Sequence, residues 1–89
     1  MTRPSFLSRI EADYPPEARR RHLQGAVLLR LFISERGALD RIEVVTSSGH
    51  RLLDEAAARA LQRSRFRPAY EGDDPIPSRA EFTVTFRLD

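Results

Sequence analysis

The stretch "VVTSSGHRLLDEAAARAL" (44–61) brings a serine, a histidine and an acid close together, at Ser48, His50 and Asp54. These residue types could form a nucleophilic site, in which a base activates the serine and an acid orients the base. His50 follows Ser48 by only two residues and precedes the expected helix, so nothing in the sequence positions its ring against the hydroxyl. The G-x-S-x-G pattern of a nucleophile elbow is also absent. We therefore expect no catalytic residue and no enzyme.

The same serines suit a structural role, because an extended segment must turn into a helix at this point. Ser47 or Ser48 is well placed to cap the helix or to shape the turn that leads into it. The alternative, a hydrolase that uses Ser48 and His50, predicts loss of turnover in a Ser48→Ala variant. We expect that substitution to change stability only modestly.

The histidine and cysteine content predicts no metal site, and because the sequence has no cofactor-binding loop we expect no bound cofactor. His22 and His50 are the only histidines, and they form neither an HxxxH pattern nor a cluster with acids. The chain has no cysteine, which excludes disulfides and thiolate ligands.

The charge distribution argues against a nucleic-acid partner. The net charge is only +2, although all fifteen basic residues are arginine and "RRRH" (19–22) is a basic run. Thirteen acids are interspersed with the arginines, so no single-signed surface of the kind that tracks phosphates is expected. An arginine-rich nucleic-acid binder stays open as an alternative, and a steep salt dependence of oligonucleotide binding would support it.

Hydrophobic periodicity predicts the main elements in the order α-β-β-α-β within one small domain of 89 residues. A short helix is expected within 13–25, strands over 26–34 and 39–47 with a turn at 35–37, a helix within the stretch 44–61 quoted above, a loop over 65–77 and a strand over 80–88. This order indicates an α+β fold, a three-stranded antiparallel sheet with two helices packed on one face. If the last strand lands beside the first, the first strand is central.

The last strand should then form an edge of the sheet. Residues 80–88 alternate between apolar and polar types and contain no proline, so nothing in the segment blunts that edge. Either residues 1–13 cover the edge, or it stays open to pair with an extended partner. A homodimer that forms through the same strand is a further alternative.

Residues spread over 14–88 together resemble the TonB carboxy-terminal domain family. The matching elements are Tyr14-Pro15 with Ala18, Gly25, Gly37, Ser47-Ser48-Gly49, Leu53-Asp54 with Ala56-Ala57, Arg65-Phe66 with Pro68, Gly72 and the final "FTVTFRL". The resemblance divides the chain into a linker or N-terminal extension, 1–13, and a TonB-like domain, 14–89.

The resemblance implies the periplasmic domain of an energy transducer that is anchored in the inner membrane of a Gram-negative bacterium. It implies an ExbB–ExbD-type motor, reached through an N-terminal anchor and spacer that this chain lacks, and outer-membrane transporters for siderophore-bound iron, haem or other nutrients. We therefore expect an excised domain. A TonB-like domain of another envelope protein is the alternative.

The resemblance also implies where the transporter binds. In the family the last strand pairs with the transporter's Ton box, a short extended segment, by β-strand addition. The docking strand here would be Ala80, Glu81, Phe82, Thr83, Val84, Thr85, Phe86, Arg87 and Leu88. The family's Tyr-Pro motif carries over to Tyr14 and Pro15 as partner contacts, with Glu11 to Asp13 as weaker candidates.

Overall fold

The structure is a computed structural model that describes residues 5–6 and 12–88. Its long elements are α1 (Pro16–Arg20), β2 (Gly25–Ile33), β3 (Leu39–Thr46), α2 (Arg51–Gln62) and β7 (Ser78–Phe86). Four short strands complete it: β1 (Ser5–Phe6), β4 (Phe66–Arg67), β5 (Ala69–Glu71) and β6 (Asp74–Ile76). Neither helix in this described part of the chain has the length and hydropathy to span a bilayer.

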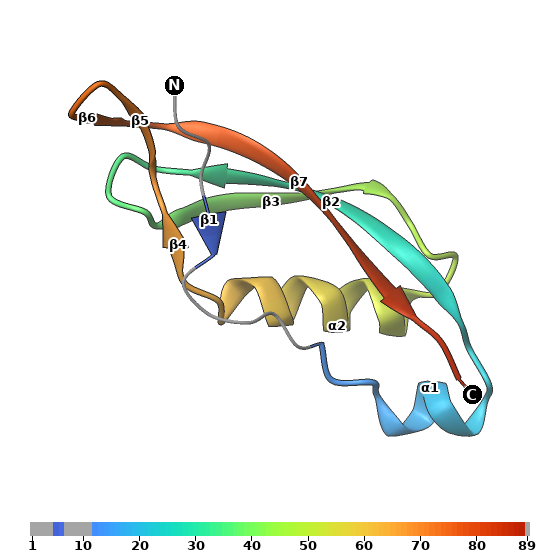
Figure 1. The fold of residues 1–89 in the computed structure, drawn as a ribbon. Helices are drawn as coiled ribbons and strands as arrows, with labels where there is room; N and C mark the ends of the chain where they lie inside the picture. Colours follow the sequence, from blue (N-terminus) through green and yellow to red (C-terminus); the bar gives the residue numbers. More distant parts are fainter. Residues whose placement is uncertain (1–4, 7–11, 89) are drawn as a thin grey trace.

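The long strands form one antiparallel sheet in the order β3-β2-β7 (Figure 1). Both helices lie on the same side of this sheet in Figure 1. The α+β class, the three-stranded sheet and the central position of the first long strand are therefore confirmed. Pairing of β2 with β7 runs without a break from Gly25 opposite Phe86 to Ile33 opposite Ser78.

The core lies between the inner face of the sheet and the helices. Every second side chain of β2 is buried there, because a strand alternates its side chains between two faces. The apolar residues of α2 recur at helical spacing and form one stripe against the sheet. The fully buried side chains Val27, Leu29, Leu31, Leu53 and Leu61 form the centre of this core. Ala18 of α1 and Phe66 of β4 join the same cluster.

The segment 65–77 differs from the expected loop. It contains β4, which pairs with β1, and the hairpin of β5 and β6, which turns at Gly72 with φ +62°. The β1–β4 pair joins Ser5 with Arg67 and Phe6 with Phe66, residues 62 and 60 positions apart, so local periodicity gives no sign of it. The last strand also begins earlier than expected, at Ser78, and ends at Phe86.

A candidate partner-binding edge

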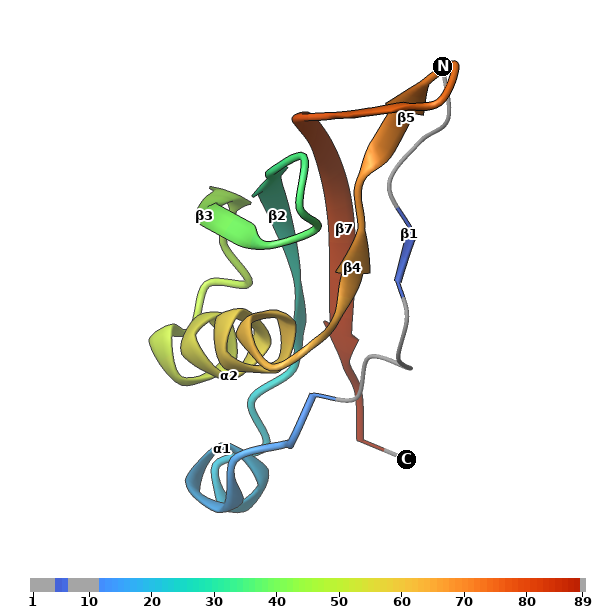
Figure 2. The same cartoon turned by 90° about the vertical axis from the view of Figure 1, so that its left-hand side faces the viewer.

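The outer edge of β7, on the side away from β2, is the candidate site, and we call it the β7 edge. Among the described residues no strand pairs with this edge. β1, the described strand within the N-terminal 1–13, pairs with β4 instead. Figure 2 shows β7 at one side of the sheet and β3 at the other, with β2 between them. The remaining part of the proposed cover, residues 1–4 and 7–11, lies outside the described residues, as does Glu11 among the weaker contact candidates.

The two edges of the sheet differ in regularity. The pairing of β3 with β2 shifts register twice, between Leu28 and Leu29 and between Phe32 and Ile33. Such irregularities twist an edge strand and disrupt the alternation of its backbone groups, which hinders the addition of another strand. The pairing of β7 with β2 has no shift over nine residues. The β7 edge is therefore the edge better suited to accept an extended partner.

Most of the expected docking strand lies in β7. Residues 80–86 are within it, with Val84 and Phe86 buried, Thr83 and Thr85 exposed on the other face, and Phe82 half-buried. Arg87 and Leu88 lie past the end of β7, where the Leu88 N–H donates to Gln24 Oε1 at 2.9 Å. Ser78 and Arg79 also belong to β7, two residues before its expected start at Ala80. Ser78 and Arg79 are both polar, so the apolar–polar alternation of the sequence begins only at Ala80, although exposure alternates through both residues in the structure.

Tyr14 lies beside the end of β7. Its ring contacts that of Phe86 edge to face, with 5.3 Å between the centroids, and its hydroxyl donates to the Leu23 carbonyl oxygen. The guanidinium carbon of Arg19 lies 5.1 Å from the Tyr14 ring centroid.

Pro15 lines a cavity of about 200 Å³ between α2 and the segment before α1. The other residues that line this cavity are Asp13, Tyr14, Pro16, Ala56, Arg59 and Arg63. Tyr14 therefore adjoins the candidate edge and is itself packed into the domain.

The Ser48, His50 and Asp54 group has a structural arrangement. The Asp54 carboxylate accepts bonds from the Ser47 hydroxyl, from the Ser48 hydroxyl at 2.7 Å and from the Ser48 N–H at 2.9 Å. The His50 N–H donates to Ser48 Oγ at 3.1 Å, while no hydrogen bond joins the His50 ring to that hydroxyl. His50 itself is the N-cap of α2, and it has no side-chain cap bond. The serines thus shape the turn rather than cap the helix.

Asp54 is held in its charged form by these contacts. Burial alone would raise the pKa of its carboxyl, but the bonds from Ser47 and Ser48, aided by the nearby His50, outweigh burial and lower the pKa below its ordinary value of 3.8. An ionised acid that binds two serines fixes the corner between β3 and α2. In the part of the chain that the structure describes, no three residues among His, Asp and Glu gather where they could hold a metal ion.

The fold with its regular sheet edge belongs to a class of small α+β domains, and comparison with known proteins specifies the family. A family model described as "Gram-negative bacterial TonB protein C-terminal" matches residues 10–88. This match covers most of the chain, and the chain belongs to that family.

Individual relatives agree with this assignment. The protein tonB2 of Pseudomonas aeruginosa is 36% identical over 84 residues, which cover 94% of this chain and 31% of that protein. The protein TonB of Vibrio cholerae is 26% identical over 88 residues, 98% of this chain and 36% of that protein. The solution structure of the Pseudomonas aeruginosa TonB C-terminal domain has a TM-score of 0.79 and 26% identity, covering 97% of this chain and 87% of that one. The chain thus spans about a third of the length of these curated relatives.

Proposed function

We propose that this domain is the periplasmic part of a TonB-like energy transducer, and that its β7 edge binds the Ton box of outer-membrane transporters by β-strand addition. The observation that carries the proposal is the difference between the two sheet edges, one broken by register shifts and one regular over nine residues. An added strand gains backbone hydrogen bonds along its length, whatever its side chains.

Backbone pairing suits a transducer that pulls on its partner. Hydrogen bonds between parallel or antiparallel strands are loaded together in shear when one strand is pulled along the other. Each bond contributes about 0.5–1.5 kcal/mol net, so the complex would be modest in affinity and reversible. Such pairing requires little side-chain specificity, which would let one domain serve several transporters for siderophore-bound iron, haem or other nutrients.

The rest of the transducer belongs to the proposal as well. Because the chain spans about a third of its curated relatives, an inner-membrane anchor, a proline-rich spacer and an ExbB–ExbD-type motor are proposed from the family alone. The division into 1–13 and 14–89, the contacts of Tyr14 and Pro15, and the docking role of residues 80–88 stay predictions in the same way. A homodimer through β7 stays an alternative, and sedimentation of the free domain tests it.

An amide-resolved NMR titration tests the binding mode. A ten-residue extended peptide rich in Val and Thr should shift amides along β7 and around Tyr14. Two versions of the peptide provide a matched pair, one N-methylated at the odd-numbered residues and the other at the even-numbered residues. Only every second residue of a strand forms hydrogen bonds with a given neighbour, so the methyl groups block these bonds in one version only. One version should lose binding and the other retain it. Equal loss in both versions, or shifts confined to β3, would count against pairing at the β7 edge.

A further inference from the structure

The open face of the sheet, opposite the helices, carries two rows of side chains that cross all three long strands. Paired residues on adjacent strands define the rows, since side chains directly opposite each other are neighbours. The arginine–phenylalanine row consists of Arg41, Phe32 and Arg79, and the glutamate–arginine row consists of Glu43, Arg30 and Glu81. The rows lie two residues apart along each strand.

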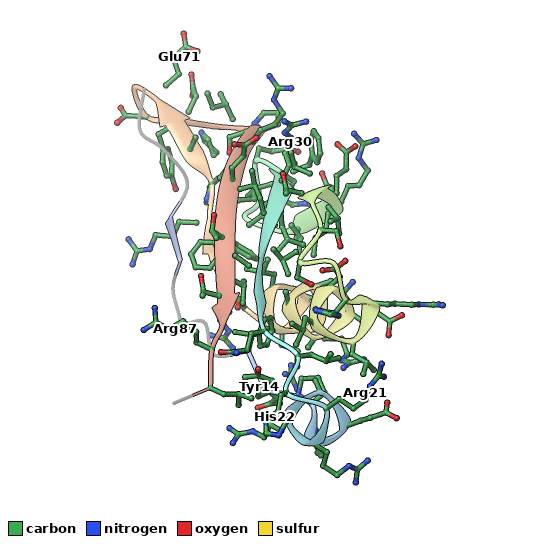
Figure 3. The ribbon with its side chains drawn as sticks, turned by 90° about the vertical axis from the view of Figure 1, so that its right-hand side faces the viewer. Tyr14, Arg21, His22, Arg30, Glu71 and Arg87 are labelled. Carbon is green, nitrogen blue, oxygen red and sulfur yellow. The ribbon has the colours of Figure 1, made fainter. Side chains whose placement is uncertain are left out.

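Contacts along the rows show that the side chains interact. The guanidinium carbon of Arg41 lies 4.3 Å from the centroid of the Phe32 ring. Arg30 donates to Glu81 from Nη2 at 2.9 Å and from Nε at 3.3 Å. Figure 3 labels Arg30 on β2, beside β7. Charge therefore alternates across the glutamate–arginine row, with a central arginine between two acids.

At β7 both rows end in charges that have capacity for another partner. Arg79 is exposed and forms no ion pair with any other described residue. The Glu81 side chain keeps 49% of its surface exposed, and both bonds from Arg30 end on Oε2, so no described residue donates to Oε1. A cavity of about 380 Å³ lined by Arg30, Arg79, Ala80 and Glu81 lies at this place.

The helices do not cover these charges, because they lie on the other side of the sheet in Figure 1, the side to which the buried residues of β2 point. The β1–β4 pair is drawn alongside β7, on the side away from β2, in Figure 2, and Arg79 and Glu81 are exposed nevertheless. Arg79 and Glu81 alternate with the inward-facing positions Ala80 and Phe82, so their side chains stand on the open face. A strand added at the β7 edge would place its own alternate side chains directly beside them.

We propose, on the basis of the proposed strand addition, that the β7 edge selects an extended partner with opposite charges two residues apart, an acid beside Arg79 and a base beside Glu81. The base extends the alternation of the glutamate–arginine row by one strand. The acid neutralises Arg79. The only other charged residue in the arginine–phenylalanine row is Arg41, which has the same sign. The order of the two charges follows the direction of the added strand, acid first if parallel and base first if antiparallel.

Four ten-residue peptides test this inference. They share a Val/Thr-rich background and differ at two positions, i and i+2, as Glu/Lys, Lys/Glu, Glu/Glu and Lys/Lys. The first two have the same composition and net charge, so a difference between them reports the placement of charge rather than its sum. Binding is followed by amide shifts at low salt, with each peptide N-terminally acetylated and C-terminally amidated.

One of the two mixed-charge peptides should bind β7 tighter than the other three by about threefold to tenfold, as expected for two cross-strand pairs. In an Arg79→Glu variant, which breaks no ion pair among the described residues, the Lys/Lys peptide should become the tightest. The preference should shrink in 1 M salt. Glu81→Gln should reduce the charge preference only at the peptide position that lies beside residue 81, which is the second position if the added strand is parallel and the first if it is antiparallel.

Arg41→Glu is the matched control. Arg41 and Glu43 have the same types and spacing as Arg79 and Glu81, but they lie on the edge with register shifts. The control should leave the peptide ranking unchanged. If all four peptides shift β7 amides with equal affinity, the charge selection is wrong while strand addition holds. If none of the four shifts β7 amides, the proposed function fails and the charge selection fails with it.

Discussion

The ring of Tyr14 meets the ring of Phe86 edge to face, with 5.3 Å between their centroids and 79° between their planes. This contact joins the segment that precedes α1 to the last residue of β7. The Tyr14 hydroxyl adds a bond to the carbonyl of Leu23, just before β2. One side chain therefore ties three segments of the chain together, next to the β7 edge.

Truncation of Tyr14 should destabilise the domain. Tyr14→Ala loses the half-buried ring and should lower the free energy of unfolding by about 2 kcal/mol, less than the roughly 3–5 kcal/mol for a fully buried aromatic ring. Tyr14→Phe keeps the ring, loses the bond to Leu23 and should cost about 1 kcal/mol. Urea unfolding measures both. Tyr70→Ala is the control, since Tyr70 is 37% exposed; an equal cost at Tyr70 would mean that the Phe86 contact contributes nothing.

The Asp54 cluster should make stability depend on acid pH. Because the folded-state pKa of Asp54 is lowered, its contribution is complete above the ordinary value of 3.8 and is lost as the pH falls through the lower folded value. Ser48→Ala removes one of the hydrogen bonds that lower the pKa of Asp54. The substitution should therefore lower the free energy of unfolding by about 1 kcal/mol at neutral pH and make the loss of stability below pH 3.8 less steep. Urea unfolding between pH 2 and 7 measures this decline.

Ser64→Ala gives the comparison for that experiment. The Ser64 hydroxyl donates to the Ala60 carbonyl at 2.9 Å, a bond to a group that does not titrate. Its loss should lower stability by a similar amount at every pH. If the stability of the Ser48→Ala and Ser64→Ala variants fell in parallel with decreasing pH, the ionisation of Asp54 would not explain the acid dependence.

Two glycines separate the effect of backbone conformation from that of crowding. Gly37 and Gly72 both have positive φ, +80° and +62°. A Cβ at Gly37 would lie 2.7 Å from the Phe66 carbonyl oxygen, whereas a Cβ at Gly72 would meet nothing within 4 Å. Gly72→Ala should lower the free energy of unfolding by about 1 kcal/mol, because alanine is strained in the left-handed conformation. Gly37→Ala should lower it by at least about 1 kcal/mol more, because the β2–β3 turn must also move to make room for the Cβ. Thermal or urea unfolding measures the stability of both variants. Equal losses of stability would contradict the close approach of a Cβ at Gly37 to the Phe66 carbonyl oxygen.

Hydrogen exchange should show the β7 edge directly. In the free domain, amides of β7 that donate to β2 should exchange slowly, and those that point away should exchange fast, in alternation along the strand. The residues of β2 from Leu29 to Phe32 pair with both β3 and β7 and should show slow exchange at consecutive positions. Binding of an extended peptide should slow the fast set of β7. Uniform protection of β7 without a peptide would indicate that the edge is already covered.

The sequence predicted the elements whose signals are local. Alternation marked β2 and β7, and the spacing of Leu53, Ala57 and Leu61 marked the buried stripe of α2. The β1–β4 pair was missed, because two-residue strands have no period and their partners lie far apart in sequence.

Side-chain partners were predicted less well than elements. Glu55 pairs with Arg51 at 2.8 Å, although Arg59 also lies four residues away on the helix surface, so helical spacing alone does not decide between the two arginines. The charged rows of the open face depend on register, which places Arg30 between Glu43 and Glu81. A single sequence contains the members of the rows but not the register that aligns them.

The unequal edges of the sheet also limit how copies of this domain could assemble. If two copies paired through β7, both β7 edges would be buried in the contact. Only the two β3 edges, whose pairing with β2 has register shifts, would then stay open to a further strand. A symmetric contact of this kind closes on itself. Growth would stop at the dimer, and the domain would resist forming the endless stacked strands of a fibril.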